Sequence, residues 1–253
     1  MKPANPFSRL LLKIDISMTE AFIRSSLLLG DKAMTRIESA RIILFGVGGV
    51  GSWCAEGLIR NGVRHLTIVD CDNVCESNIN RQLEATSLTV GQVKVEVMKA
   101  RLLEINPEAE IVAINKQYTR ENSAEFALDD YDYIIDAIDS LKDKIDLLLT
   151  ASRCHGQVFS SMGAAKKIDP CKVKVAELFS VRGCPLGAMI RKRMRQNKTL
   201  PAKAITCVYD EEVLENVKDK ETRINGSLVH ITSIFGMTLC GLILKDLYYR
   251  EDD

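Results

Sequence analysis

The segment from Gly46 to Gly51 constrains the fold of this chain more than any other part. It reads Gly-Val-Gly-Gly-Val-Gly, after an apolar run at 41–46 and at the start of a helical pattern over 49–60. A glycine-rich turn lets the backbone approach a phosphate, and the free amides of a helix N-terminus favour an anion. The sequence therefore predicts a nucleotide-binding turn between a buried strand and a helix.

Strand-like and helical segments alternate on both sides of this turn. Strands are predicted at 41–46, 65–70, 110–115, 131–138 and 157–162, with helices at 19–29, 31–40, 49–60, 92–105, near 122–128 and at 140–155. This order predicts an α/β fold: a doubly wound, Rossmann-like, mostly parallel sheet with helices on both faces. Two later strands, 172–179 and 204–209, flank a basic helix near 186–196 and predict a C-terminal β/α extension.

We divide the chain into three parts on these patterns. Residues 1–18 carry two prolines and no clear period, which predicts a flexible lead-in. Residues 19–165 form the nucleotide-binding domain, and residues 166–253 extend the same domain. Within the extension, 227–244 is apolar and close to the length of a bilayer span. Its serines, threonines and glycines favour a buried or dimer-interface helix over a membrane span.

Composition excludes several classes of protein. The 253 residues include 34 basic and 34 acidic side chains, so the net charge is zero and the chain is not globally basic. The chain opens without a signal-like segment, so we expect a cytoplasmic protein. Eight cysteines without a Cys-x-x-Cys pair argue against a zinc ribbon and a disulfide scaffold.

Charged residues follow the ends of several predicted strands. Asp70 ends the second strand, where a carboxylate can hold ribose hydroxyls, and Asp139 follows a later strand. Arg81 and Lys94 lie on the segments after Asp70. Because parallel strands end at one edge, we expect these four side chains to converge over the glycine turn. Two cations and a carboxylate suited to Mg2+ indicate a triphosphate site rather than the pyrophosphate site of an NAD(P)-dependent dehydrogenase, which stays as an alternative.

Four stretches, GVGGVGS, VDCDNVCESNINRQ, VGQVK and DAIDS, resemble the adenylating enzymes related to ubiquitin-activating enzyme and the molybdopterin-synthase and thiamin-biosynthesis adenylyltransferases. The resemblance implies attack of a carboxylate on the ATP α-phosphate, giving an acyl adenylate and pyrophosphate. The chain is most similar to the tRNA threonylcarbamoyladenosine dehydratases, through VGGVGSWCAEGLIRNGV, DAIDSLKDK and KIDPCKVKVAELF. That family adenylates the threonyl carboxylate of a modified adenosine in tRNA and cyclises it.

The resemblance also implies roles for individual residues. The catalytic set is Arg81, Lys94, Asp139 as the Mg2+ ligand, and Arg24, which would enter the partner subunit's ATP site. The nucleotide-binding set is Gly46, Gly48, Gly49, Gly51, Ser52, Asp70, Asp72, Asn78, Gln82 and Ser140. The implied partners are ATP, tRNA and a second copy of the chain in a homodimer. A sulfur-relay protein is a further partner that the residues do not identify.

A basic segment gives independent support for an RNA partner. Between Ala164 and Ile205 the chain has eleven lysines and arginines but only two acidic residues, Asp169 and Glu177. In a chain of zero net charge this asymmetry predicts contact with tRNA phosphates. A solvated helix face, or neutralisation by the acidic stretch 210–221, are the alternatives.

Other functions stay open at this point. One is an adenylyltransferase that activates the C-terminal Gly-Gly of a small sulfur-carrier protein, although the missing cysteine pairs favour the dehydratases. Another is a non-catalytic adapter, which would not need Arg81, Lys94 and Asp139. Cys184 and Cys207 are candidates for an acyl-accepting thiol, but no histidine lies near either in the sequence, so we expect buried structural cysteines.

Overall fold

The computed structural model describes residues 20–218 and 224–250, so the predicted lead-in at 1–18 lies outside the described residues. A seven-stranded sheet forms its centre, in the order β3-β2-β1-β4-β5-β7-β6. The strands are β1 Arg41–Phe45, β2 His65–Val69, β3 Glu110–Ile114, β4 Tyr133–Asp136, β5 Gln157–Ser161, β6 Lys174–Glu177 and β7 Thr206–Tyr209. Every pairing is parallel except that of β6 with β7, which confirms the predicted α/β class.

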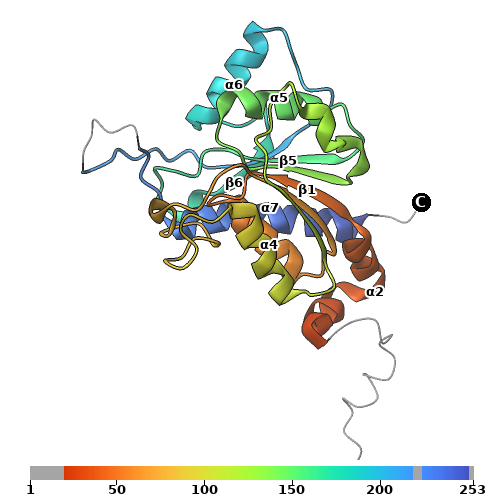
Figure 1. Ribbon diagram of the computed structural model, residues 1–253. Coiled ribbons are helices and arrows are strands. Elements are labelled where there is room, and N and C mark those ends of the chain that lie inside the picture. The colour runs from red at the N-terminus through yellow and green to blue at the C-terminus, as the bar shows by residue number, and fades with distance from the viewer. Residues whose placement is uncertain (1–19, 219–223, 251–253) are drawn as a thin grey trace, which may run out of the picture.

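Helices cover both faces of this sheet. They are α2 Ile23–Ser39, α3 Gly51–Arg60, α4 Lys94–Ile105, α5 Leu141–Ala151, α6 Pro185–Gln196 and α7 Val229–Tyr249. Figure 1 shows α5 and α6 on one side of the sheet, and α2, α4 and α7 on the other. The buried side chains form two clusters, one on each face, as the near-continuous apolar strands predict.

Some local predictions were wrong. The helix expected near 122–128 is two short 3-10 turns, η3 Ser123–Phe126 and η4 Leu128–Asp130. Ala127 separates them with a left-handed backbone (φ 43°), which no α-helix can continue through. The remaining 3-10 turns are η1 Glu20–Phe22, η2 Glu76–Asn78 and η5 Pro170–Lys172.

The late apolar segment forms α7, one face of which lies in the core. By length and composition α7 could span a membrane, but Ile231, Phe235 and Leu239 are buried against the rest of the chain. Gly236 makes the closest approach: a Cβ there would lie 2.4 Å from the carbonyl oxygen of Val50. One buried face is compatible with the expected buried or dimer-interface helix, and α7 packs against the end of the glycine turn.

Candidate active site

The glycine turn joins the end of β1 to the start of α3. Gly46 has φ +88°, and a Cβ on it would lie 2.7 Å from the carbonyl oxygen of Ala137. A Cβ on Gly51 would lie 1.8 Å from the carbonyl oxygen of Gly46. Among the described residues, no group accepts a hydrogen bond from the amides of Gly48, Gly49 or Val50. The turn therefore offers free N–H groups at a helix N-terminus, which is an anion site.

A chain of contacts ties Lys94 to this turn. Asp70 accepts hydrogen bonds from the amides of Val47, at 2.7 Å, and Asp72, at 2.9 Å. The Nζ of Lys94 then lies 2.9 Å from Asp72. Burial lowers the pKa of Lys94, but the bond to Asp72 and the charges of Asp70 and Glu84 outweigh it, so the pKa rises above its ordinary value. Lys94 therefore stays cationic beside the turn.

Arg81 and Gln82 approach the turn from the loop that follows η2. A Cβ on Gly49 would lie 3.4 Å from Cγ of Arg81, and a Cβ on Gly48 would lie 3.6 Å from Nε2 of Gln82. The Arg81 guanidinium donates to the carbonyl of Ser77 and to the side chain of Asn80, and no described carboxylate pairs with it. Its positive charge is thus available to an anion on the turn.

Asp139 lies just beyond β4, at the same edge of the sheet. Its carboxylate is exposed, and no described group makes a hydrogen bond or ion pair with it. Asp70 and Asp72 are already engaged by backbone amides and by Lys94. Asp139 is therefore an exposed carboxylate without a described partner, of the kind that can bind Mg2+ together with substrate phosphates.

Three of the residues predicted to bind nucleotide have hydrogen-bond partners within the chain. Ser52 is fully buried, and its hydroxyl accepts from the amide of Leu83 at 3.2 Å. The Asn78 side chain accepts from the amide of Cys75, and the Ser140 hydroxyl lies 2.8 Å from Asp143. These side chains shape the loops around the turn, and their roles toward a nucleotide stay predictions.

Arg24 does not join the other candidates. It is exposed in the first turn of α2, next to Phe22. Phe22 packs near Gly62, which follows the end of α3, whereas the glycine turn lies at its start. The ten residues of α3 span about 15 Å, so Arg24 lies far from its own glycine turn.

Sequence reasoning missed Glu84, which is 2% exposed. Neither of its carboxylate oxygens has a hydrogen-bond partner among the described residues. Burial raises the pKa of Glu84 to about 7, although its own backbone amide and Lys94 lower it. A buried, unpartnered carboxyl group thus lies beside the charges of Lys94 and Asp70.

Sequence reasoning also missed a buried ion pair at the end of β4. Lys144 of α5 and Asp136 are both fully buried, with Nζ and Oδ2 2.7 Å apart. Ser160 donates to the same carboxylate at 2.6 Å, and Lys144 donates to the carbonyl of Ile138 at 2.9 Å. Burial raises the pKa of Asp136, while Lys144 and Ser160 oppose that rise. The pair lies directly beneath the turn that carries Asp139.

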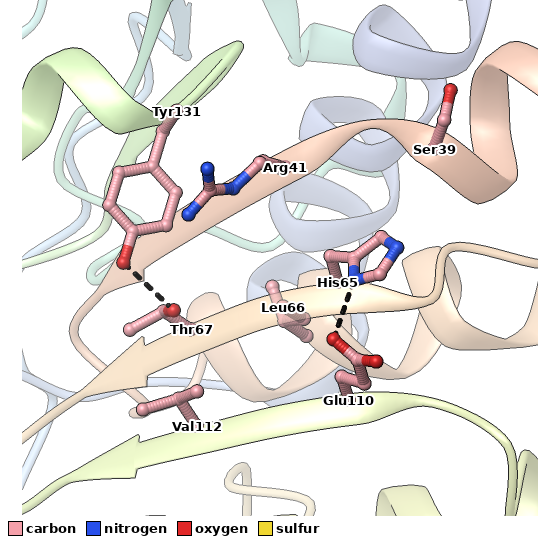
Figure 2. A pocket seen from close by; sticks show the side chains of 8 residues that line it. All are labelled: Ser39, Arg41, His65, Leu66, Thr67, Glu110, Val112 and Tyr131. Carbon is pink, nitrogen blue, oxygen red and sulfur yellow. Dashed lines mark hydrogen bonds and ion pairs between the residues drawn. The ribbon is translucent and has the colours of Figure 1, made fainter.

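A pocket of about 380 Å3 lies elsewhere, over the starts of the strands. Figure 2 shows Arg41, His65, Glu110 and Tyr131 around it, with His65 bonded to Glu110 and Tyr131 to Thr67. Because the glycine turn follows the carboxyl ends of the strands, this pocket is not the nucleotide site.

Neither Cys184 nor Cys207 presents an exposed thiol. Cys184 and Cys207 are 2% and 0% exposed, and burial raises the pKa of Cys207 far above its ordinary value. A buried thiol with a raised pKa is a poor nucleophile. Both residues fit the expected structural role.

Comparison with known proteins agrees with this geometry. A family model described as the ThiF family matches residues 23–245. The tRNA threonylcarbamoyladenosine dehydratase of Bacillus subtilis (strain 168) is 34% identical over 242 residues, covering 91% of this chain and 95% of that protein. The Adenylyltransferase and sulfurtransferase MOCS3 of Aedes aegypti is 33% identical, but over only 45% of this chain and 26% of that protein.

A solved structure gives the same assignment. Escherichia coli tRNA N6-threonylcarbamoyladenosine dehydratase, TcdA, in complex with ATP, matches with a TM-score of 0.84 and 33% identity, covering 92% of this chain and 96% of that one. The chain therefore belongs to the ThiF family and, within it, to the tRNA threonylcarbamoyladenosine dehydratases.

Proposed function

We propose that this chain is an ATP-dependent dehydratase that cyclises threonylcarbamoyladenosine in tRNA. A threonyl carboxylate oxygen attacks the ATP α-phosphorus, and pyrophosphate leaves. A nucleophilic atom of the same modified side chain then attacks the activated acyl carbon, and AMP leaves. The product base has lost one water, whose oxygen departs with AMP. We place the enzyme in the cytoplasm, with its tRNA substrate.

The observation that carries this proposal is the convergence at one sheet edge. The free amides of the glycine turn, the Cγ of Arg81 next to Gly49 and the Asp70–Asp72–Lys94 chain lie at this edge and support the proposal. Arg81 and Lys94 would stabilise negative charge that develops as pyrophosphate leaves. Asp139 would hold Mg2+, which supplies charge compensation on the phosphates.

The direct test measures pyrophosphate and AMP. Wild-type protein should release both from ATP and Mg2+ only when tRNA that carries open threonylcarbamoyladenosine is present. Release that instead requires a carrier protein ending in Gly-Gly would support the sulfur-carrier adenylyltransferase and contradict our proposal. ATP turnover that depends on neither the tRNA nor the carrier protein would contradict both the dehydratase and the adenylyltransferase.

Only some of the basic residues between Ala164 and Ile205 are available for contact with tRNA. Several of its lysines already have partners inside the chain: Lys172 lies 2.8 Å from Glu212, and Lys174 lies 3.0 Å from Glu211. Lys167 and Lys203 are bonded to backbone carbonyls, and Arg191 is buried and donates to Leu178. The predicted neutralisation by the acidic stretch is thus real for part of the segment.

Four of the six remaining basic residues gather on α6 and just beyond it. Lys192, Arg193, Arg195 and Lys198 are exposed, and no described carboxylate pairs with them. Arg195 also lies over the ring of Phe179, with its guanidinium carbon 5.5 Å from the ring centroid. We assign tRNA phosphate contact to this outer face of α6.

This assignment is tested by neutralising the free charges. Replacing Arg193, Arg195 and Lys198 with glutamine should raise KM for tRNA and leave ATP affinity unchanged. The salt dependence of tRNA binding should fall by about 0.7–0.9 in slope for each lost contact. The matched control is Lys172→Gln with Lys174→Gln, whose charges are already paired. Equal effects in the two variants would contradict the assignment.

We also propose a two-fold homodimer in which Arg24 serves the partner subunit's site. Its distance from its own glycine turn supports this arrangement. Leu27 and Leu28 on the same helix are 62% and 80% exposed, which provides apolar contact area. Arg24→Ala and Lys94→Met homodimers should each be inactive, and mixed subunits should recover about a quarter of wild-type activity by statistical pairing. No recovery in a mixed dimer would contradict this role.

A further inference from the structure

The backbone between β4 and α5 is fixed at every residue that leads to Asp139. The amide of Ala137 donates to the carbonyl of Phe45 at 2.8 Å, and the amide of Ile138 donates to Asp136 at 3.2 Å. The carbonyl of Ile138 accepts from Lys144 at 2.9 Å. Ala137 also lies directly against Gly46. The Asp139 side chain has no partner among the described residues, so the restraint lies on the backbone that leads to Asp139 and not on its carboxylate.

Lys144 is the residue of this arrangement that comes from another element, because it lies on α5 and contacts the end of β4 and the segment after it. Its ammonium group is fully buried, reaches back from α5, and bonds the carboxylate at the end of β4 and the carbonyl two residues later. Burying an ion pair costs solvation free energy, so such a pair is weak grounds for stability alone. A fully bonded buried network does, however, fix the groups that it joins.

We infer that Lys144 is a positioning residue that, through Ile138, holds the backbone that presents Asp139 beside the glycine turn for Mg2+. The inference rests on the proposed function, because it assigns Mg2+ to Asp139. Outer contacts that orient a metal ligand change metal affinity without touching the metal. Lys144 is fully buried behind the turn, so it has no direct part in substrate contact.

The test distinguishes two roles of Lys144: holding the backbone at Ile138, and neutralising the buried carboxylate of Asp136. Lys144→Met alone leaves Asp136 buried without its cation and is expected to destabilise the fold. The double variant Asp136→Asn with Lys144→Met removes both charges, and the new amide oxygen can still accept from Ile138. The ion pair and the bond from Lys144 to the Ile138 carbonyl are then lost, and the Ser160 hydroxyl can accept from the new NH2 group instead of donating to the carboxylate. Lys142→Met, an exposed lysine two residues earlier, is the matched control.

The readout is calorimetric binding of ATP with and without Mg2+, which does not depend on turnover. In the folded double variant, ATP binding without Mg2+ should match that of the wild-type protein. The Mg2+ concentration that gives half of the metal-dependent tightening should rise by about 10-fold or more. Lys142→Met should leave it unchanged. A double variant with wild-type Mg2+ dependence would overturn the inference, because Lys144 would then only neutralise Asp136.

If the double variant does not fold, a second variant, Lys144→Arg, tests the same inference. Lys144→Arg keeps the charge balance but moves the donor, so it should weaken the Mg2+ dependence while ATP binding without metal stays the same. An unchanged Mg2+ dependence in Lys144→Arg would count against the inference. Wild-type protein that shows the Mg2+ effect but leaves tRNA unchanged would defeat the proposed function and not the positioning role.

Discussion

Two buried lysines lie near the same edge of the sheet, and their surroundings differ. Lys144 and its partner Asp136 are both 0% exposed, and both oxygens of Asp136 accept hydrogen bonds. Lys94 is 6% exposed, but its partner Asp72 is 63% exposed, and the nearby carboxyl of Glu84 has no partner. In the cluster of Lys144 and Asp136, both carboxylate oxygens have partners within the chain, and we call it the complete cluster. In the cluster of Lys94, Asp72 and Glu84, the Glu84 carboxyl has no partner among the described residues, and we call it the incomplete cluster. The complete cluster around Lys144 holds the backbone, whereas the incomplete cluster around Lys94 leaves polar groups available, which supports our proposal that a ligand binds there.

The largest expected effect is on the rate of the reaction, which should depend directly on Lys94. Lys94→Met removes a cation from the proposed phosphate site and should lower kcat/KM by about 10²–10³-fold, as the loss of one charge-stabilising donor does. Its fold should survive, because the Asp72 carboxylate that it leaves is 63% exposed and stays hydrated without the ion pair. Steady-state kinetics and thermal unfolding check both parts. Wild-type kinetics in this variant would remove Lys94 from the site.

In thermodynamic stability the order of the two lysines should be reversed: the loss of Lys144 should destabilise the fold more than the loss of Lys94. Lys144→Met strands a buried carboxylate and should cost about 3–5 kcal/mol of unfolding free energy. Denaturant unfolding of Lys144→Met and Lys94→Met, side by side, measures the difference. Equal losses in the two variants would mean that the two clusters are not distinct.

A smaller effect concerns Glu84 and pH. Its pKa is about 7 in the folded chain against an ordinary 4.5, so the folded state holds this proton more tightly than the unfolded state. The unfolding free energy should therefore fall as pH rises from about 4.5 to about 7, by about 3 kcal/mol, and then level off.

Glu84→Gln is the matched test of that slope, because the amide stays neutral at every pH. At pH 8 the variant should be more stable than the wild-type chain, and near pH 4.5 the two should be alike. Chemical denaturation across this range measures both. Parallel stability curves for the two proteins would show that Glu84 ionises freely and that the incomplete cluster has another explanation.

Much of the fold could be predicted from local patterns, because the glycine turn and the alternation of strands and helices are both short-range signals. The 3-10 turns around Ala127 could not, since a left-handed alanine leaves no compositional mark. The joining of β6 and β7 to the main sheet depends on long-range pairing. The sequence suggested an extension there but not its strand order.

The site divides in the same way. Asp70, Arg81, Lys94 and Asp139 follow strand ends or recognisable motifs, and the structure brings their segments to one edge. Lys144 carried a signal that went unused: it shares a helix face with Leu147, Leu148 and Ala151, which a surface lysine would not. Glu84 carried none, because its burial arises from the packing of a loop against α3 and α4.

The most direct test of the central claim is mass spectrometry of nucleosides from tRNA incubated with the protein, ATP and Mg2+. The tRNA must begin with its threonylcarbamoyladenosine in the open form. We expect that nucleoside to lose the mass of one water with wild-type protein, and to remain unchanged with Lys94→Met or without ATP. An unchanged nucleoside in the presence of folded, ATP-binding wild-type protein would contradict the account.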